Sequence, residues 1–173
     1  RFSISWPRLF PNGDLVREER GFDFYNRLID ALVAAGIEPM VTLYHWDLPQ
    51  ALEDKGGWAN RLIVKSFEDY ATACAEAFGD RIKTWITLNE PWCVSWLGYS
   101  NGVHAPGKKD FKLAVAASHH TALAHAAGTK AIKKVCPNAV VGLTVNMNNI
   151  HNESPDDTEV VDFAALNDSN LNR

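Results

Sequence analysis

Trp85-Ile86-Thr87-Leu88-Asn89-Glu90-Pro91-Trp92 is the stretch from which the fold of this chain is best predicted. Its alternating apolar and β-favouring residues predict a short buried strand. Pro91 cannot donate a ladder hydrogen bond, so the strand is expected to end before it. Asn89 and Glu90 then lie at the carboxyl end of a strand beside indole rings, where α/β barrels carry catalytic side chains. A carboxyl group in such surroundings is typical of a general acid, and the alternative is a carboxylate that only caps the next helix.

Length and composition are those of an ordinary globular domain. The chain has 173 residues, of which 46% are hydrophobic and 22% charged, enough for one domain with a sizeable core. The net charge is -4 and no basic stripe is present, which disfavours a nucleic-acid partner. No apolar run approaches the roughly 18 residues of a membrane span, so no membrane association is expected.

The chain ends and the cysteines lead to an expectation about location. The sequence starts at Arg1 on a strand-like segment without an initiator Met or a signal peptide, and it stops at Arg173 within an expected helix, so we expect both ends to be cut. Cys74, Cys93 and Cys136 are an odd number without metal-type spacing, and we expect them to be reduced thiols. A cytoplasmic location is therefore favoured.

Hydrophobic periodicity predicts strands and helices in strict alternation. The expected strands cover 1–6, 40–46, 82–89 and 140–146, and the expected helices cover 21–36, 60–78, 111–135 and about 158–171. Irregular loops are expected at 7–14 and 92–110, where turn residues are dense. The second helix should begin with Asn60 as its N-cap. Its inner face should carry Leu62, Phe67, Tyr70, Ala71 and Cys74.

Alternating βα units predict a parallel sheet, which is either an open doubly wound sheet or part of a closed barrel. The loops after the strands are long and rich in polar and aromatic residues, whereas those before the strands are short. This asymmetry favours a barrel with its active site at the carboxyl rim. No Gly-rich phosphate loop follows any expected strand, which disfavours a nucleotide-binding open sheet.

The strand ends bring polar and aromatic side chains to one rim. They are Arg1 near the first strand, His45 and Trp46 at the second, Asn89 and Glu90 at the third, and Asn146 at the fourth. A carboxylic acid, an imidazole, two carboxamides, a guanidinium and indole rings suit a neutral polyol. We expect Trp6, Trp58, Trp85 and Trp96 to pack in the core instead, and Tyr99 and His104 to hold loops in place.

Metal binding is the weaker interpretation of the histidines. His45 and Asp47 are separated by one residue, but no second histidine follows at ligand spacing. His119 and His120 are adjacent in an expected helix and would point in different directions. We therefore expect neither a metal nor a cofactor.

Five motifs in order resemble the family-1 glycoside hydrolases, the retaining β-glucosidases and their relatives. They are Arg1-Phe-Ser-Ile-Ser-Trp-Pro-Arg-Leu-Phe-Pro11, Gly36-Ile-Glu-Pro-Met-Val-Thr-Leu-Tyr-His-Trp-Asp-Leu-Pro49, Gly56-Gly-Trp58, Thr87-Leu-Asn-Glu-Pro91 and Gly102-Val-His-Ala-Pro-Gly107. The resemblance runs from residue 1 to about 150 and weakens after Asn146, where the loop 151–154 is less typical. It implies a (β/α)8 TIM barrel, of which this chain carries about four βα units, resembling the second to the fifth.

The resemblance also implies roles for the rim residues in the hydrolysis of terminal non-reducing β-D-glycosidic bonds. Glu90 would be the general acid/base of a retaining mechanism. Asn89 would bind the sugar 2-hydroxyl, His45 another hydroxyl with Trp46 beside it, Arg1 the nucleophilic carboxylate, and Asn146 would line the leaving-group side. The alternatives are a disordered chain end at Arg1, a core histidine at 45 and a structural amide at 146.

The second carboxylate that retention requires is not evident in the sequence. In relatives the nucleophile lies in a segment that resembles Thr-Glu-Asn-Gly, and no Glu-Asn-Gly occurs in this sequence. Glu153 lies in an expected loop and Glu159 in an expected helix, so neither is a credible substitute. We therefore expect residues 1–173 to be part of a single glycoside hydrolase (β/α)8 catalytic domain and to be inactive alone. The alternative is a non-catalytic sugar-binding or self-assembling half-barrel module. An isolated piece of a barrel has open edges, so we expect it to be either an oligomer or loosely packed.

Overall fold

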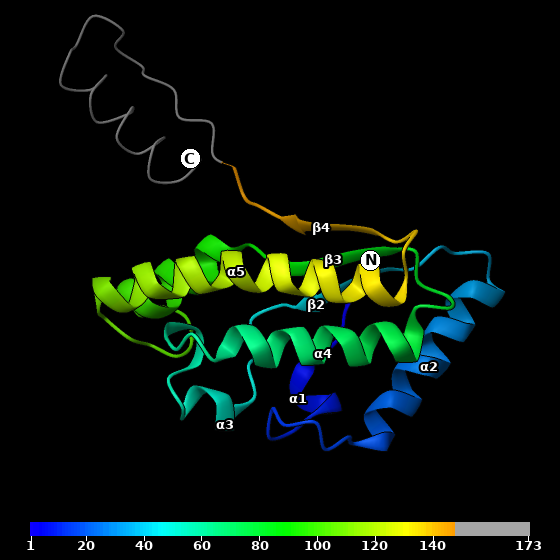
Figure 1. Ribbon diagram of the computed structural model, residues 1–173, viewed down its shortest axis with the longest axis horizontal. Helices are drawn as coiled ribbons and strands as arrows, with labels where there is room; N and C mark the ends of the chain where they lie inside the picture. Colours follow the sequence, from blue (N-terminus) through cyan, green and yellow to red (C-terminus); the bar gives the residue numbers. More distant parts are fainter. Residues whose placement is uncertain (148–173) are drawn as a thin grey trace, which may run out of the picture.

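Four parallel strands form one sheet in the order β1-β2-β3-β4 within residues 1–147, the part of the chain that the computed structural model describes (Figure 1). The strands are β1 (Phe2–Ser3), β2 (Met40–Tyr44), β3 (Thr84–Asn89) and β4 (Val140–Thr144). In register, Val41 lies between Phe2 and Trp85. Each strand pairs with the next one along the chain, and the order never reverses, which is the winding of a barrel and not of a doubly wound sheet.

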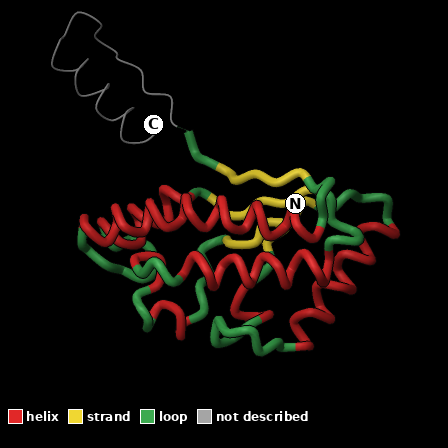
Figure 2. Tube along the Cα trace, viewed as in Figure 1, coloured by secondary structure: helices red, strands yellow, loops and turns green. Residues whose placement is uncertain are grey.

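Helices connect the strands and cover the sheet (Figure 2). They are α1 (Trp6–Leu9), α2 (Glu19–Ala34), α3 (Gln50–Glu53), the 3₁₀ helix η1 (Gly57–Ala59), α4 (Ile63–Phe78), the π-helix η2 (Cys93–Ser100) and α5 (Phe111–Val135). α4 and α5 run side by side in front of β2 and β3 (Figure 1). The predicted alternation of strands and helices is confirmed for the described residues, and the helix predicted near 158–171 lies outside them. No helix within residues 1–147 combines the length and the apolar character that crossing a membrane requires.

Aromatic rings fill the core between the sheet and α4. Trp6 stacks on Tyr70 with ring centroids 4.6 Å apart, and both are buried. The Tyr70 hydroxyl donates to the carbonyl oxygen of Leu43 at 2.9 Å, which ties α4 to β2. Trp58 and Trp85 are buried as well, whereas Trp96 is only partly buried against the core, so the predicted core packing is confirmed for Trp6, Trp58 and Trp85.

Two of the predicted loops are partly helical, and those predictions are wrong. α1 (Trp6–Leu9) covers the first part of the predicted loop 7–14, and its first turn tolerates Pro7 because that position needs no N–H donor. Within 92–110, Cys93–Ser100 form a π-helix that packs against α5. Both helices contain residues typical of turns, and tertiary packing stabilises them, so the local sequence did not predict them.

The start of α4 differs from the prediction. The helix begins at Ile63, and Leu62 precedes it with 72% of its surface exposed, so Leu62 does not belong to the inner face. Asn60 does act at this terminus, because its Oδ1 accepts a hydrogen bond from the Leu62 N–H at 3.0 Å. It therefore caps the turn before the helix and not the helix itself.

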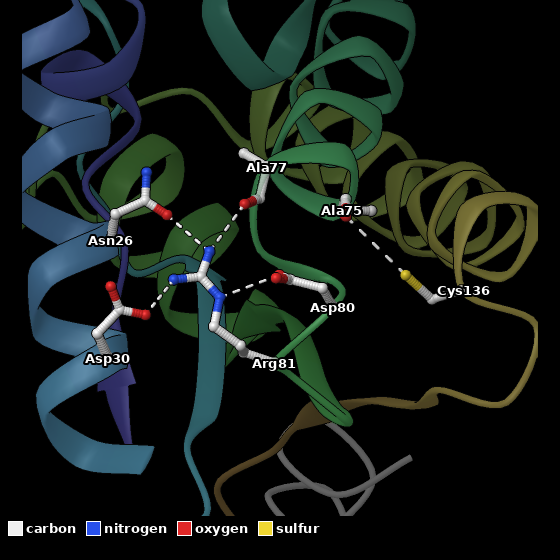
Figure 3. A network of polar contacts seen from close by, with 7 residues as sticks. All are labelled: Asn26, Asp30, Ala75, Ala77, Asp80, Arg81 and Cys136. Carbon is white, nitrogen blue, oxygen red and sulfur yellow. Dashed lines mark hydrogen bonds and ion pairs between the residues drawn. The ribbon is translucent and has the colours of Figure 1, made fainter. Parts of the chain in front are cut away.

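Arg81 joins elements at the amino end of β3 (Figure 3). Its guanidinium donates to Asp30 and Asn26 of α2, and also to Asp80 and the carbonyl oxygen of Ala77. The two aspartates are largely exposed, so each ion pair contributes at most about 1 kcal/mol. This network stabilises the amino end of β3, whereas Asn89 lies at its carboxyl end.

Candidate functional site

The carboxyl rim of the sheet carries most of the predicted residues, and the structure joins several of them. β3 ends at Asn89, and Glu90 follows directly. The Arg1 guanidinium donates through Nη2 to Asn89 Oδ1, and through Nε to Thr42 Oγ1 at 3.1 Å. Arg1 precedes β1 at the amino end of the sheet, and its side chain reaches along the sheet to join Thr42 of β2 to the end of β3.

His45 and Trp46 follow the last residue of β2, and neighbouring strands hold both. Ser3 Oγ of β1 lies 2.9 Å from His45 Nδ1, which leaves Nε2 as the nitrogen available to a ligand. The Trp46 indole Nε1 donates to the main-chain carbonyl of Asn89 at 2.9 Å. The predicted strand 40–46 is two residues shorter than expected, and these two residues turn out of it.

Backbone strain in the described residues occurs at the same rim. Among non-glycine residues of 1–147, positive φ is found at Trp46 (77°) and Glu90 (47°). Such conformations cost about 1–3 kcal/mol each and persist where the surroundings over-determine them, which is common at functional sites. The strain therefore marks the two strand ends independently of any motif.

Glu90 is anchored through its main chain and contacts a thiol. Its N–H donates to the carbonyl oxygen of Thr144 at 2.9 Å, across from β3 to β4. Its Oε2 accepts a weak hydrogen bond from Cys93 Sγ at 3.4 Å, and the Asn146 amide donates to the same sulfur at 3.8 Å. Burial, with the neighbouring Glu90 carboxylate, raises the pKa of Cys93 to about 11, so this thiol stays protonated at neutral pH. Cys93 thus links Glu90 with Asn146.

A cleft of about 1010 Å³ opens beside these residues. Its lining includes Trp46 and Asp47 after β2, and Tyr99 and His104 after β3. The Trp46 and His104 rings lie 5.0 Å apart, and the Tyr99 hydroxyl donates to Glu53 Oε2 at 2.7 Å. Aromatic walls with a few polar groups suit a polar organic ligand. The bonds of Tyr99 match the loop-holding role predicted for it.

Two contacts of the rim were missed by the sequence analysis, those of Cys93 and Thr144. Cys93 follows Glu90 by three residues, a spacing at which residues in a helical turn meet, and this signal could have identified it. Thr144 comes from a strand end that was recognised, but its hydroxyl gave no chemical signal. Within the described residues no group of three or more His, Cys, Asp and Glu side chains could hold a metal ion.

The fold and the rim define a class of protein: parallel βα units of a barrel, with an acid, amides and an imidazole at its carboxyl end. The sequence pattern of Glycosyl hydrolase family 1 matches residues 1–172, and the chain belongs to this family. Its four strands and their helices match part of the family's TIM barrel. The predicted family and fold class are therefore confirmed.

The chain is similar to several bacterial β-glucosidases. It is 51% identical over 146 residues to beta-glucosidase A of Thermotoga maritima, covering 84% of this chain and 33% of that protein. It is 42% identical over 166 residues to beta-glucosidase A of Acetivibrio thermocellus, covering 96% and 37%. The structure of the Thermotoga maritima β-glucosidase in complex with deoxynojirimycin superposes with a TM-score of 0.93 at 46% identity, covering 96% and 37%. The chain thus spans about a third of the length of these relatives. The roles of the individual rim residues and an oligomeric state stay predictions.

Proposed function

We propose that residues 1–173 form part of a single (β/α)8 catalytic domain that hydrolyses terminal non-reducing β-D-glycosidic bonds with retention of configuration. The observation that carries this proposal is the strained Glu90 at the end of β3, next to an Asn89 amide that Arg1 holds. Membership of a glycoside hydrolase family and similarity to proteins named β-glucosidases support it.

In the first step Glu90 is the general acid. It donates its proton to the glycosidic oxygen as the bond between that oxygen and the anomeric carbon breaks, while a carboxylate on the opposite face of the sugar forms an ester to the same carbon. In the second step Glu90 takes a proton from water, whose oxygen attacks the anomeric carbon and releases the carboxylate. Each bond to the anomeric carbon is exchanged with inversion, so the configuration is retained overall.

The attacking carboxylate is proposed to come from a part of the domain other than residues 1–173. Glu53 lines the cleft, but its Oε2 accepts the Tyr99 hydroxyl at 2.7 Å. Asp47 has a buried Oδ1 without a hydrogen-bond partner in the described residues, and burial raises the pKa of its carboxyl, which disfavours an ionised nucleophile. Arg1 would hold the true nucleophile ionised with its guanidinium, which lies beside Asn89.

The remaining rim residues would bind the sugar. The Asn89 amide is proposed to donate to the 2-hydroxyl, a contact that strengthens in the transition state. His45 would use Nε2 for another hydroxyl, because Ser3 holds Nδ1, and Trp46 would lie beside it. Asn146 would line the leaving-group side, near Cys93 and Glu90.

The test of Glu90 compares leaving groups in a complete (β/α)8 domain that contains these residues. Glu90→Gln should lower kcat/KM for unactivated β-glucosides by about 10²–10⁴-fold, and the glycosylation step of activated aryl glucosides far less, because only poor leaving groups need the proton. Glu53→Gln is the control, a carboxylate that lines the neighbouring cleft and accepts a hydrogen bond from the Tyr99 hydroxyl. Equal, mild losses on both substrate types in Glu90→Gln would remove Glu90 from the role.

The activity of the chain by itself separates the enzyme from a binding module. Residues 1–173 alone should turn over no aryl β-glucoside above background, and the completed domain should release the β-configured sugar. Turnover by the isolated chain that disappears in Glu90→Ala would contradict the proposal. Asp47 and Glu53 would then be the first residues to test as the nucleophilic carboxylate. A completed domain that binds glucosides without hydrolysing them would favour the sugar-binding module.

A further inference from the structure

Thr144, the last residue of β4, contacts both functional residues at the end of β3. Its hydroxyl donates to Asn89 Oδ1 at 2.9 Å, and its main-chain carbonyl accepts the Glu90 N–H at 2.9 Å. The two strands pair irregularly here, with a register shift between Ile86 and Asn89 that places Asn89 opposite Thr144. One residue of β4 therefore holds the side chain of Asn89 and the backbone of Glu90.

The hydrogen bonds of the Asn89 amide can be accounted for atom by atom. Asn89 is 5% exposed, so its orientation depends on its protein partners. Its Oδ1 has two lone pairs, and accepts from Arg1 Nη2 and from Thr144 Oγ1. The reversed amide would place its NH₂ group against the Arg1 guanidinium, donor against donor. The oxygen is therefore saturated, and Nδ2 is the end of the amide left for a ligand.

Arg1 and Thr144 constrain this amide in different ways. Arg1 is exposed and reaches Asn89 on a long side chain with several rotatable bonds. Thr144 is β-branched, lies on a strand and has a stiff χ1 angle. The guanidinium thus selects which end of the amide faces the rim, and the threonine hydroxyl sets where that end lies.

We propose that Thr144 is a positioning residue which, through Asn89, determines how much the 2-hydroxyl of a sugar contributes to binding affinity. This inference rests on the proposed function, in which Asn89 binds that hydroxyl. It assigns the chain a specificity for 2-hydroxylated over 2-deoxy sugars that depends on a side chain with no contact to the substrate. Because the carbonyl of Thr144 holds Glu90 independently of the side chain, a change of the side chain leaves the anchor of Glu90 in place.

The test measures discrimination between two ligands that differ by one hydroxyl. In a complete (β/α)8 domain that contains residues 1–173, calorimetry gives the Kd of 1-deoxynojirimycin and of its 2-deoxy counterpart. Thr144→Val keeps the branched shape and removes the donor, Thr144→Ser keeps the donor, and Thr144→Ala is a second variant without it. The ratio of the two Kd values should shrink about 3- to 10-fold in the Val and Ala variants, the range of one hydrogen bond, and stay near the parent value in the Ser variant. Hydrolysis of an aryl β-glucoside should lose kcat more than KM changes.

Each outcome decides between distinct explanations. An unchanged ratio in Thr144→Val and Thr144→Ala overturns the positioning role and leaves the proposed function intact. Equal weakening of both ligands means a general structural role and also overturns it. If the parent domain binds neither ligand, or binds both equally, the assignment of Asn89 fails and this inference fails with it.

Discussion

Tyr99 connects the two loops that form the cleft, and Tyr99→Phe should destabilise the protein markedly. The hydroxyl donates to Glu53 Oε2 at 2.7 Å, and accepts the main-chain N–H of Trp58 at 3.0 Å. Tyr99 is 1% exposed. Burial, with the nearby Glu53 carboxylate, raises the pKa of Tyr99, so the hydroxyl remains a donor throughout the neutral range. The mutation removes this oxygen and leaves the rest of the ring in place.

The size of the effect follows from the two bonds. A hydrogen bond to a charged group contributes about 1.5–3 kcal/mol, and a buried N–H left without a partner costs about 1–3 kcal/mol. Glu53 is partly exposed, so in Tyr99→Phe water can take the place of the lost hydroxyl as a hydrogen-bond donor to its carboxylate. Trp58 is buried, so its N–H stays without a partner. We expect a decrease of about 2–4 kcal/mol in the free energy of unfolding.

Urea unfolding with Tyr70→Phe as the matched control tests this reasoning. Tyr70 is equally buried, but its hydroxyl makes one bond to the neutral carbonyl of Leu43. Its loss should therefore cost only about 0.5–1.5 kcal/mol. Equal decreases in the two variants would show that the bond to Glu53 and the N–H of Trp58 carry no special energy. A changed urea dependence (m-value) would mean an altered denatured state instead of a lost contact.

Two further predictions concern packing and pH. Gly128→Ala should lower the midpoint of thermal unfolding, because the new Cβ would lie 2.7 Å from Phe67 Cε1. This clash should outweigh the preference of helices for Ala over Gly, which is about 1 kcal/mol. A raised midpoint would show that α4 and α5 separate easily. Asp47→Asn should gain stability relative to the parent as pH rises above about 4, because burial raises the pKa of this carboxyl and the folded state loses stability when the group ionises. Urea midpoints that differ between the two proteins by the same amount at every pH would contradict this.

The fold could be predicted largely because the periodic elements carry strong local signals. The helix predicted at 111–135 is α5 to the residue, because Asp110 caps it and Pro137 follows its end. The Asp110 carboxylate accepts from the N–H groups of Lys112 and Leu113. The π-helix Cys93–Ser100 could not be predicted in this way, because its stability comes from packing against α5 and its own residues include turn formers.

The candidate site could be predicted as residue types but not as contacts. Strand ends and motif resemblance identified Asn89, Glu90, His45 and Arg1 without any coordinates. The hydroxyl of Thr144 bonds an amide 55 positions earlier in the chain, and no local pattern encodes that pairing. It depends on the irregular register between β3 and β4, which periodicity cannot resolve because a one-residue shift in pairing changes every facing pair.

The backbone conformation at the rim is the part that sequence patterns predict least. Trp and Glu rarely adopt positive φ, so no local rule predicts this conformation at either residue, and the predicted strand 40–46 runs through Trp46. Both residues leave the extended conformation, and each is held by a specific bond, from Trp46 Nε1 to the Asn89 carbonyl and from the Glu90 N–H to the Thr144 carbonyl. The strain is therefore tolerated because tertiary hydrogen bonds oppose it. Since those bonds join three strands, the geometry at Glu90 depends on β2 and β4 as much as on the Asn-Glu-Pro sequence around it.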